Sequence, residues 1–124
     1  MRKHKMKKIL LAVSDKAYSR ALSLKLQNAK YEVLTVPNGE EALLEIWRNE
    51  FDLLLCDLVM PKTNGFEVLE ELKKQDKKIP VIILMNIFQE EDEKKVKDLG
   101  ALDVFIKADV TILEIINKIK EILN

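Results

Sequence analysis

The chain is predicted to form an α/β domain, a (βα)5 doubly wound fold in which a five-stranded parallel sheet carries helices on both faces. Two observations predict this class. Short apolar runs rich in Val, Ile and Leu alternate along the chain with longer segments of helical periodicity. The 124 residues are enough for one domain with one continuous core. Right-handed crossovers between successive strands then place helices on both faces of the sheet.

Five apolar runs are the expected strands. They are continuous and do not alternate between apolar and polar residues, which is typical of parallel strands covered on both faces. The runs are ILLAV at 9–13, YEVLTV at 31–36, LLLC at 53–56, PVIILM at 80–85 and VFI at 104–106.

The first two helices are expected between these runs. Tyr18, Leu22 and Leu26 recur at a spacing of four and predict an apolar stripe on the first helix. The second helix is expected to begin at Asn38, a favoured N-cap residue type. Two glutamates follow in its first turn, where the helix dipole favours acidic side chains.

The remaining three helices follow the third, fourth and fifth strands. The third helix is expected after Gly65. A highly charged fourth helix is expected from about Glu90 to Leu99, ending at Gly100, a glycine in the position typical of a helix C-terminus. The fifth is expected to start after Asp109 and carries an isoleucine stripe.

Composition narrows the classes of function. With 48% hydrophobic and 34% charged residues, the chain is typical of a globular protein and not of a disordered one. Lys plus Arg and Asp plus Glu number 21 each, so no net field would recruit nucleic acid or an anionic membrane. Neither direct nucleic-acid binding nor membrane association is expected. The sole cysteine, Cys56, lies in an apolar run and is expected to be a buried structural thiol, as suits a cytoplasmic protein.

The basic N-terminus is not expected to be a signal peptide. The apolar run behind it, residues 9–13, has five residues, whereas a signal peptide needs an apolar region of about 7–15. We therefore predict a single folded domain at residues 7–124 and a solvated basic tail at residues 1–6.

Polar residues follow four of the five expected strands. They are Ser14 and Asp15, Asp57, Asn86 and Lys107. In open parallel sheets, ligands bind outside the carboxyl ends of the strands, so an acid and a lysine at this edge can share a small anion. Capping of the first helix is an alternative role for Asp15.

The segment LLLCDLVMPKTNGFEVL at 53–69 resembles the signature of response-regulator receiver domains: an apolar strand, the acceptor aspartate, a Met-Pro pair, then Gly and a new helix. The resemblance extends from about Lys7 to Leu123 and implies the strand order 2-1-3-4-5. Further matching segments are NGEEAL at 38–43, IPVIIL at 79–84 and GA at 100–101, which leads to Lys107.

The resemblance also implies a chemistry. In such domains an aspartate carboxylate accepts a phosphoryl group from a sensor histidine kinase, with help from a divalent cation, a lysine and a mobile hydroxyl. By position, Asp57 resembles the phosphoryl acceptor and Lys107 the phosphate-contacting lysine. The backbone carbonyl of Val59 would be a contact of the metal.

The metal site departs from the family pattern. Val13 and Ser14 stand where the family has its acidic pair, and Mg²⁺ prefers hard oxygen ligands in octahedral geometry. Asp15 replaces a lost ligand only if the strand end shifts by one residue. The candidate metal ligands are Asp15, Asp57, Val59 and Ser14, and Mg²⁺ as a cofactor is therefore in doubt.

The switch positions also depart from the pattern. Met85 replaces the usual hydroxyl residue, and Val104 replaces the switch aromatic, with Phe105 on the opposite face of its strand. Ala108 replaces the proline after the lysine, so the peptide bond between Lys107 and Ala108 is expected to be trans.

Three functions remain open at this point. The leading one is a receiver-type signalling module of two-component phosphorelay systems, not an enzyme, with Asp57 as the acceptor and a degraded metal and switch site. The alternative is a pseudo-receiver that binds proteins independently of phosphorylation. A remote alternative is a small flavodoxin-like cofactor-binding or hydrolase domain, which the absence of a glycine-rich phosphate loop disfavours.

The expected partners follow from the resemblance. They are a sensor histidine kinase or an output protein, and a second copy of the chain bound through the fourth helix, fifth strand and fifth helix. Ile87 and Phe88, between the fourth strand and the fourth helix, are candidate interface residues if they are exposed. The alternative is that they pack under the fourth helix.

Overall fold

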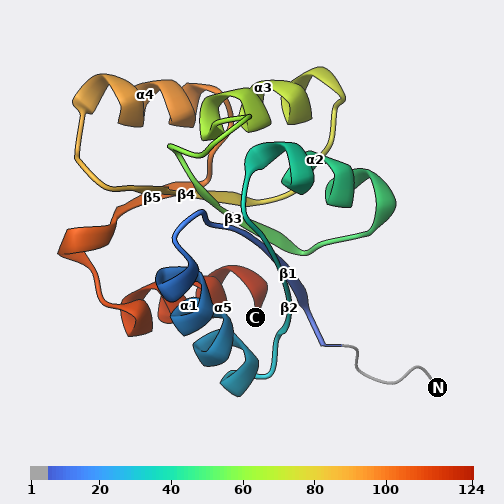
Figure 1. Cartoon of the computed structure of the whole chain (residues 1–124), viewed down its shortest axis with the longest axis vertical. Helices are drawn as coiled ribbons and strands as arrows, with labels where there is room; N and C mark the ends of the chain where they lie inside the picture. The colour runs from blue at the N-terminus through green and yellow to red at the C-terminus, as the bar shows by residue number, and fades with distance from the viewer. Residues whose placement is uncertain (1–5) are drawn as a thin grey trace.

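The computed structural model describes residues 6–124 and contains one five-stranded parallel sheet, with the strands in the order β2-β1-β3-β4-β5 (Figure 1). The predicted fold class and strand order are therefore confirmed. The strands are β1 Lys8–Ala12, β2 Glu32–Val36, β3 Leu53–Asp57, β4 Val81–Met85 and β5 Asp103–Ile106.

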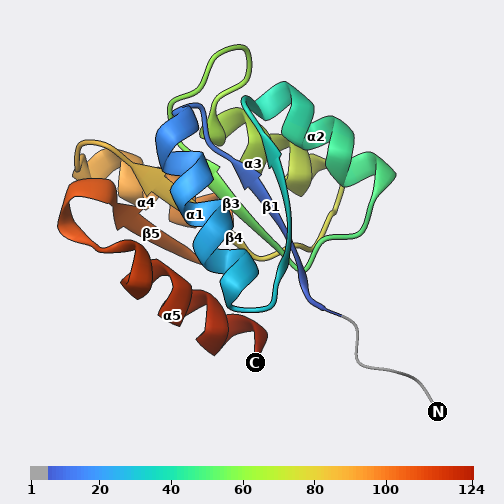
Figure 2. The same cartoon turned by 60° about the horizontal axis from the view of Figure 1, so that its bottom comes forward.

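The helices form two layers, with α1 and α5 on one face of the sheet and α2, α3 and α4 on the other (Figures 1 and 2). A short 3-10 helix, η1, connects β5 to α5. The helices are α1 Lys16–Asn28, α2 Gly39–Arg48, α3 Gly65–Lys74, α4 Glu90–Asp98, η1 Lys107–Asp109 and α5 Ile112–Leu123.

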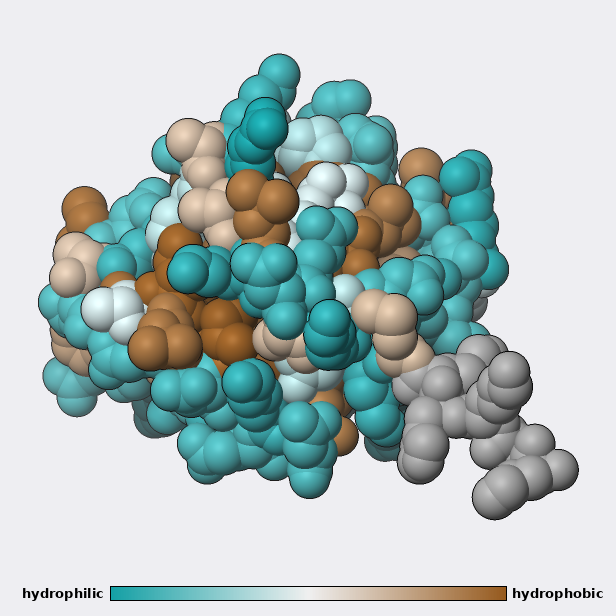
Figure 3. Space-filling model, turned by 90° about the horizontal axis from the view of Figure 1, so that it is seen from below, coloured by the Kyte–Doolittle hydropathy of each residue, from teal (hydrophilic) through white to brown (hydrophobic). Residues whose placement is uncertain are grey.

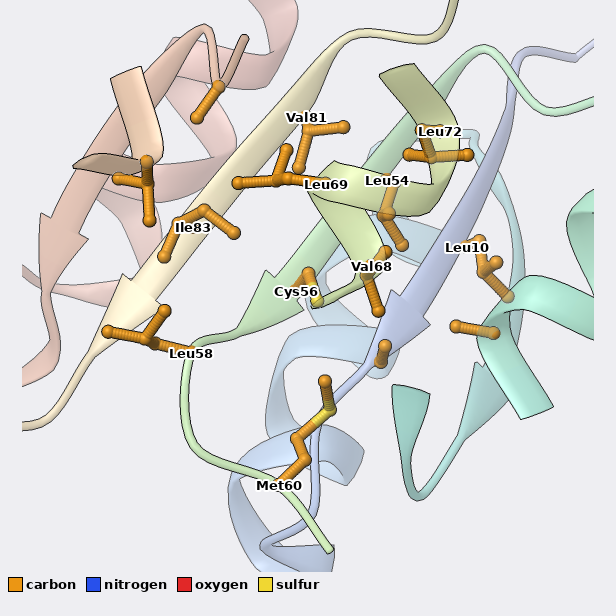
Figure 4. Packing of buried hydrophobic residues seen from close by; sticks show 14 of the residues in the cluster. Leu10, Leu54, Cys56, Leu58, Met60, Val68, Leu69, Leu72, Val81 and Ile83 are labelled. Atoms are coloured by element: carbon orange, nitrogen blue, oxygen red, sulfur yellow. The ribbon is translucent and has the colours of Figure 1, made fainter. Parts of the chain in front are cut away.

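Alternate residues of each strand belong to two different hydrophobic clusters, as the period of two in a strand requires. On β3, Leu54 and Cys56 pack with residues of α2, α3 and α4, and Figure 4 shows them among Val68, Leu69 and Leu72. Leu53 and Leu55 pack instead with residues of α1 and α5. This parity fixes which polar residue at the strand ends points to which helical layer.

Helix boundaries follow local capping chemistry. Asn38, Asn64 and Thr111 each accept a hydrogen bond from a backbone N–H in the first turn of α2, α3 and α5. Gly100 follows α4 with φ 107°, a left-handed conformation that favours glycine. Both the expected start of α2 and the expected end of α4 are thus confirmed.

The α1–α5 side of the molecule is seen in Figure 3, where several hydrophobic patches lie between hydrophilic side chains. Within residues 6–124, no helix combines the length and the apolar character needed to cross a bilayer. The predicted tail at residues 1–6 lies almost entirely outside the described residues.

Candidate functional site

Asp57 is the last residue of β3, in the middle of the sheet, and its side chain is 3% exposed. It continues the row of Leu53 and Leu55 and therefore lies on the face covered by α1 and α5. Its Oδ2 accepts a hydrogen bond of 3.1 Å from the backbone N–H of Ser14, just beyond β1. A carboxylate in this position is fixed by neighbouring strands and not by a flexible loop.

Lys107 follows β5 and brings its ammonium group to the same edge of the sheet. Its Nζ lies 2.8 Å from Asp57 Oδ1, and both side chains are largely buried. The contact is an ion pair and not a hydrogen bond, since its geometry leaves Oδ1 without a hydrogen-bond partner among the described residues. The predicted convergence of the acid and the lysine on one edge is confirmed.

Tyr18 completes this corner, and sequence reasoning had placed it only in the apolar stripe of α1. Its ring centroid lies 4.7 Å from Lys107 Nζ, within the range of a cation–π interaction. Burial and, to a smaller extent, the charge of Asp57 raise the pKa of the Tyr18 phenol above its ordinary value. Lys107 is thus held between a carboxylate and an aromatic ring.

Gly65 explains why the chain leaves β3 so tightly. Its backbone N–H donates to the carbonyl of Leu58 at 2.8 Å, and a Cβ added at Gly65 would lie 2.9 Å from the carbonyl oxygen of Asp57. Any larger residue at this position would push α3 away from the end of β3. The glycine of the receiver-like signature therefore has a packing reason at this site.

Of the candidate metal ligands, Asp15 has a structural role as well. Its Oδ1 accepts a 3.1 Å hydrogen bond from the backbone N–H of Tyr18 and caps α1, so the capping alternative is confirmed. Val13 is buried among apolar residues and offers no ligand. No group of three His, Cys, Asp or Glu side chains within residues 6–124 is arranged to hold a metal ion.

The remaining oxygens at the site are few. Among residues 6–124, Asp57 Oδ1 has no hydrogen-bond donor, and no backbone N–H donates to the carbonyl of Val59, which lies in the exposed connection after β3. Mg²⁺ in proteins often keeps several waters and is held by one or two carboxylates together with phosphate oxygens. The residues therefore fit a loosely held ion and do not form an all-protein cage.

The residues at the expected switch positions, Met85 and Val104, pack in or against the hydrophobic core. Met85 is 2% exposed and belongs to the cluster under α2, α3 and α4. Val104 packs on that same cluster, whereas Phe105 packs on the α1–α5 side, as the strand parity predicted. Within residues 6–124 there is no cis peptide bond, so the trans bond expected before Ala108 is confirmed.

The connection from β4 to α4 is exposed. Ile87 and Phe88 are 72% and 51% exposed, so the alternative that they pack under α4 is wrong. No side-chain cap begins α4, because its N-cap residue Gln89 makes no such hydrogen bond. Trp47 on α2 is also more than half exposed.

Cys56 lies next to the acceptor candidate but points to the opposite face. It is fully buried, and its Sγ donates to the carbonyl oxygen of Asp57 at 3.3 Å. Burial, followed by the charge of Asp57, raises the pKa of the thiol far above its ordinary value. Cys56 is therefore an inert structural thiol, because the thiolate is the reactive form.

Comparison with known proteins places this geometry in a family. Residues 9–120 match the family model described as the response regulator receiver domain. The chain is 33% identical over 101 residues to the alkaline phosphatase synthesis transcriptional regulatory protein PhoP of Bacillus subtilis, covering 82% of this chain and 42% of that protein. It is 35% identical over 100 residues to the probable transcriptional regulator ycf27 of Galdieria sulphuraria, covering 81% and 39%. The chain thus spans about two fifths of these curated relatives.

Solved structures give the same result. The receiver domain of a Francisella response regulator superimposes with a TM-score of 0.88 at 28% identity, covering 94% of this chain and 95% of that one. The chemotaxis protein CheY4 of Vibrio cholerae superimposes with a TM-score of 0.87 at 27% identity, covering 96% and 100%. With the acid and the lysine paired at the carboxyl edge of a 2-1-3-4-5 sheet, this chain belongs to the response regulator receiver domain family.

Proposed function

We propose that Asp57 accepts a phosphoryl group from a sensor histidine kinase and that the chain serves as the receiver module of a two-component system. The observation that carries the proposal is the 2.8 Å ion pair between Asp57 and Lys107 at the carboxyl edge of the sheet. A buried carboxylate beside a lysine is a nucleophile with a cation ready for the incoming oxygens.

The transfer balances as a substitution at phosphorus. One Asp57 oxygen forms a bond with the phosphorus, while the bond from phosphorus to the donor's nitrogen or oxygen breaks. The donor leaves with that electron pair, and Asp57 becomes an acyl phosphate. Because Lys107 covers the carboxylate, its ammonium must move from Asp57 Oδ1 toward the phosphoryl oxygens as the group arrives.

A divalent cation such as Mg²⁺ would be held by Asp57 and the carbonyl of Val59, with Ser14 and Asp15 as weaker candidates. When bound, it would offset the negative charge that gathers during transfer. Asp15 is already used in the cap of α1, and Ser14 contributes its backbone N–H to Asp57. We therefore expect weak affinity for Mg²⁺ and a larger share of the charge compensation from Lys107.

The test uses acetyl phosphate as the donor, with and without Mg²⁺, and intact mass as the readout. The wild-type chain is expected to gain one phosphoryl group, and Asp57→Asn none. Asp52→Asn is the matched control, because Asp52 immediately precedes the first residue of β3, at the end of the strand opposite to Asp57. There its carboxylate accepts a hydrogen bond of 2.7 Å from the backbone N–H of Lys8. It should be modified like the wild type.

A specific observation favours the second candidate, a pseudo-receiver that binds a partner without phosphorylation. The position of the switch hydroxyl is taken by Met85, which is buried in the core. Absence of any mass gain in the wild type would support this second function. The exposed Ile87 and Phe88, and the α4–β5–α5 face as a homodimer surface, would then be the first places to look for partner binding.

A further inference from the structure

Three buried side-chain oxygens within residues 6–124 have no hydrogen-bond partner, and two of them lie at the acceptor corner. They are the Tyr18 hydroxyl and Asp57 Oδ1. Lys107 Nζ lies 2.8 Å from Asp57 Oδ1 and 4.7 Å from the centroid of the Tyr18 ring. The third is the hydroxyl of Tyr31, which immediately precedes β2 at the other end of the sheet. Buried polar groups are almost always paired, so an unpaired hydroxyl at a reaction site calls for an explanation.

The position of Tyr18 is fixed from two directions. Its backbone N–H is held by the carboxylate of Asp15, which sets the start of α1. Its ring is held under the Lys107 ammonium, 4.7 Å from the centroid. A tyrosine phenol is ordinarily protonated at neutral pH, and burial, followed by the charge of Asp57, raises the pKa of Tyr18 further. The hydroxyl can therefore act as a hydrogen-bond donor.

A hydroxyl donor is what the opposite side of this site lacks. The thioether of Met85 cannot donate a hydrogen bond to a phosphoryl oxygen. Met85 also lies in the row of Val81 and Ile83, which faces α2, α3 and α4 and not the α1 side where Asp57 and Tyr18 lie. The unpaired hydroxyl next to this site therefore comes from α1 and not from β4.

We propose that the Tyr18 hydroxyl donates a hydrogen bond to an oxygen of the phosphoryl group on Asp57 and so replaces the hydroxyl missing at Met85. This inference rests on the proposed function, because it needs Asp57 to carry that group. The ring of Tyr18 has a separate role, because it supports Lys107 while the ammonium shifts from Asp57 Oδ1 to the phosphoryl oxygens.

The test compares Tyr18→Phe with Tyr31→Phe. Both variants remove an unpaired buried tyrosine hydroxyl and keep the ring, but only the ring of Tyr18 contacts Lys107, the partner of Asp57. The rate of phosphorylation by acetyl phosphate is followed by intact mass. Tyr18→Phe is expected to be about 10-fold slower than the wild type, the effect of losing one hydrogen bond to a charged group, and Tyr31→Phe is expected to match the wild type.

A further variant separates the hydroxyl from the ring. Tyr18→Leu also removes the support of Lys107 and should be slower than Tyr18→Phe. Equal rates for the wild type, Tyr18→Phe and Tyr31→Phe would overturn the role of the Tyr18 hydroxyl and leave Asp57 as the acceptor. A wild-type chain that gains no phosphoryl group at all would overturn both proposals.

Discussion

The acceptor corner and the β4–α4 connection lie at the same edge of the sheet but differ in how they are held. At the acceptor corner, Lys107 contacts both the Asp57 carboxylate and the Tyr18 ring, and each of the three residues comes from a different element of the fold. At the end of β4, Met85 is buried in the core, while Ile87 and Phe88 in the connection that follows are exposed. One region holds charged and polar groups in contact, and the other presents apolar side chains to the core and to solvent.

This difference separates modification from readout. A receiver that signals must both bind the phosphoryl group and change shape in response. Driving a two-state equilibrium from 1:99 to 99:1 takes about 5.5 kcal/mol, and one hydrogen bond to a charged group supplies about 1.5–3. Because Met85 and Val104 can contribute no such contact, we expect a β4–α4 connection that responds weakly even when Asp57 is phosphorylated.

The largest effect on stability is expected when Lys107 is changed. Lys107→Met keeps the aliphatic stem but leaves the Asp57 carboxylate buried without its cation, which should lower the free energy of unfolding by about 3–5 kcal/mol. Urea unfolding measures the change. The double variant Lys107→Met/Asp57→Asn should recover most of the loss, because no unpaired charge then remains. Strictly additive losses would show that the two groups are not coupled, and the acceptor corner would no longer be distinct.

Met85 should be nearly as sensitive, for a different reason. Met85→Thr restores the hydroxyl typical of the family but removes buried apolar volume, so we expect a loss of about 2–4 kcal/mol. Met85→Leu conserves volume and should cost less than about 1.5 kcal/mol. Thermal and urea unfolding compare the two. If the threonine variant were as stable as the leucine variant, Met85 would be a free switch position and not part of the core.

A smaller effect tests which role Asp15 has. Asp15→Ala removes the N-cap of α1 and should cost about 1 kcal/mol, whereas Asp15→Asn caps equally well and should be close to the wild type in stability. The same pair is titrated with Mg²⁺. Unchanged affinity in Asp15→Asn is expected if the side chain only caps, and a clear loss would restore Asp15 as a metal ligand.

The sequence predicted well what depends on periodicity and local chemistry. Continuous apolar runs located all five strands, and the polar residues behind them located Asp57 and Lys107 at one edge. The role of Tyr18 was missed, because an aromatic residue at helical spacing is typical of a core stripe, and its contact with Lys107 depends on how α1 lies against β5. The exposure of Ile87, Phe88 and Trp47 was likewise set by tertiary packing and not by any local pattern.

The smallest effect on stability should come from the exposed connection, where binding is the informative readout. Phe88→Asp is expected to change the free energy of unfolding by less than about 0.5 kcal/mol, because half of the side chain is already in water. Leu24→Asp is a matched control, since Leu24 on α1 is 52% exposed and Phe88 is 51% exposed. Self-association, measured by sedimentation, and binding to a kinase or output protein, measured by pull-down, should then be weaker for Phe88→Asp and unchanged for Leu24→Asp. Equal binding by the two variants would exclude the β4–α4 connection as an interface. Of the two regions compared, only the acceptor corner would then remain a candidate functional site.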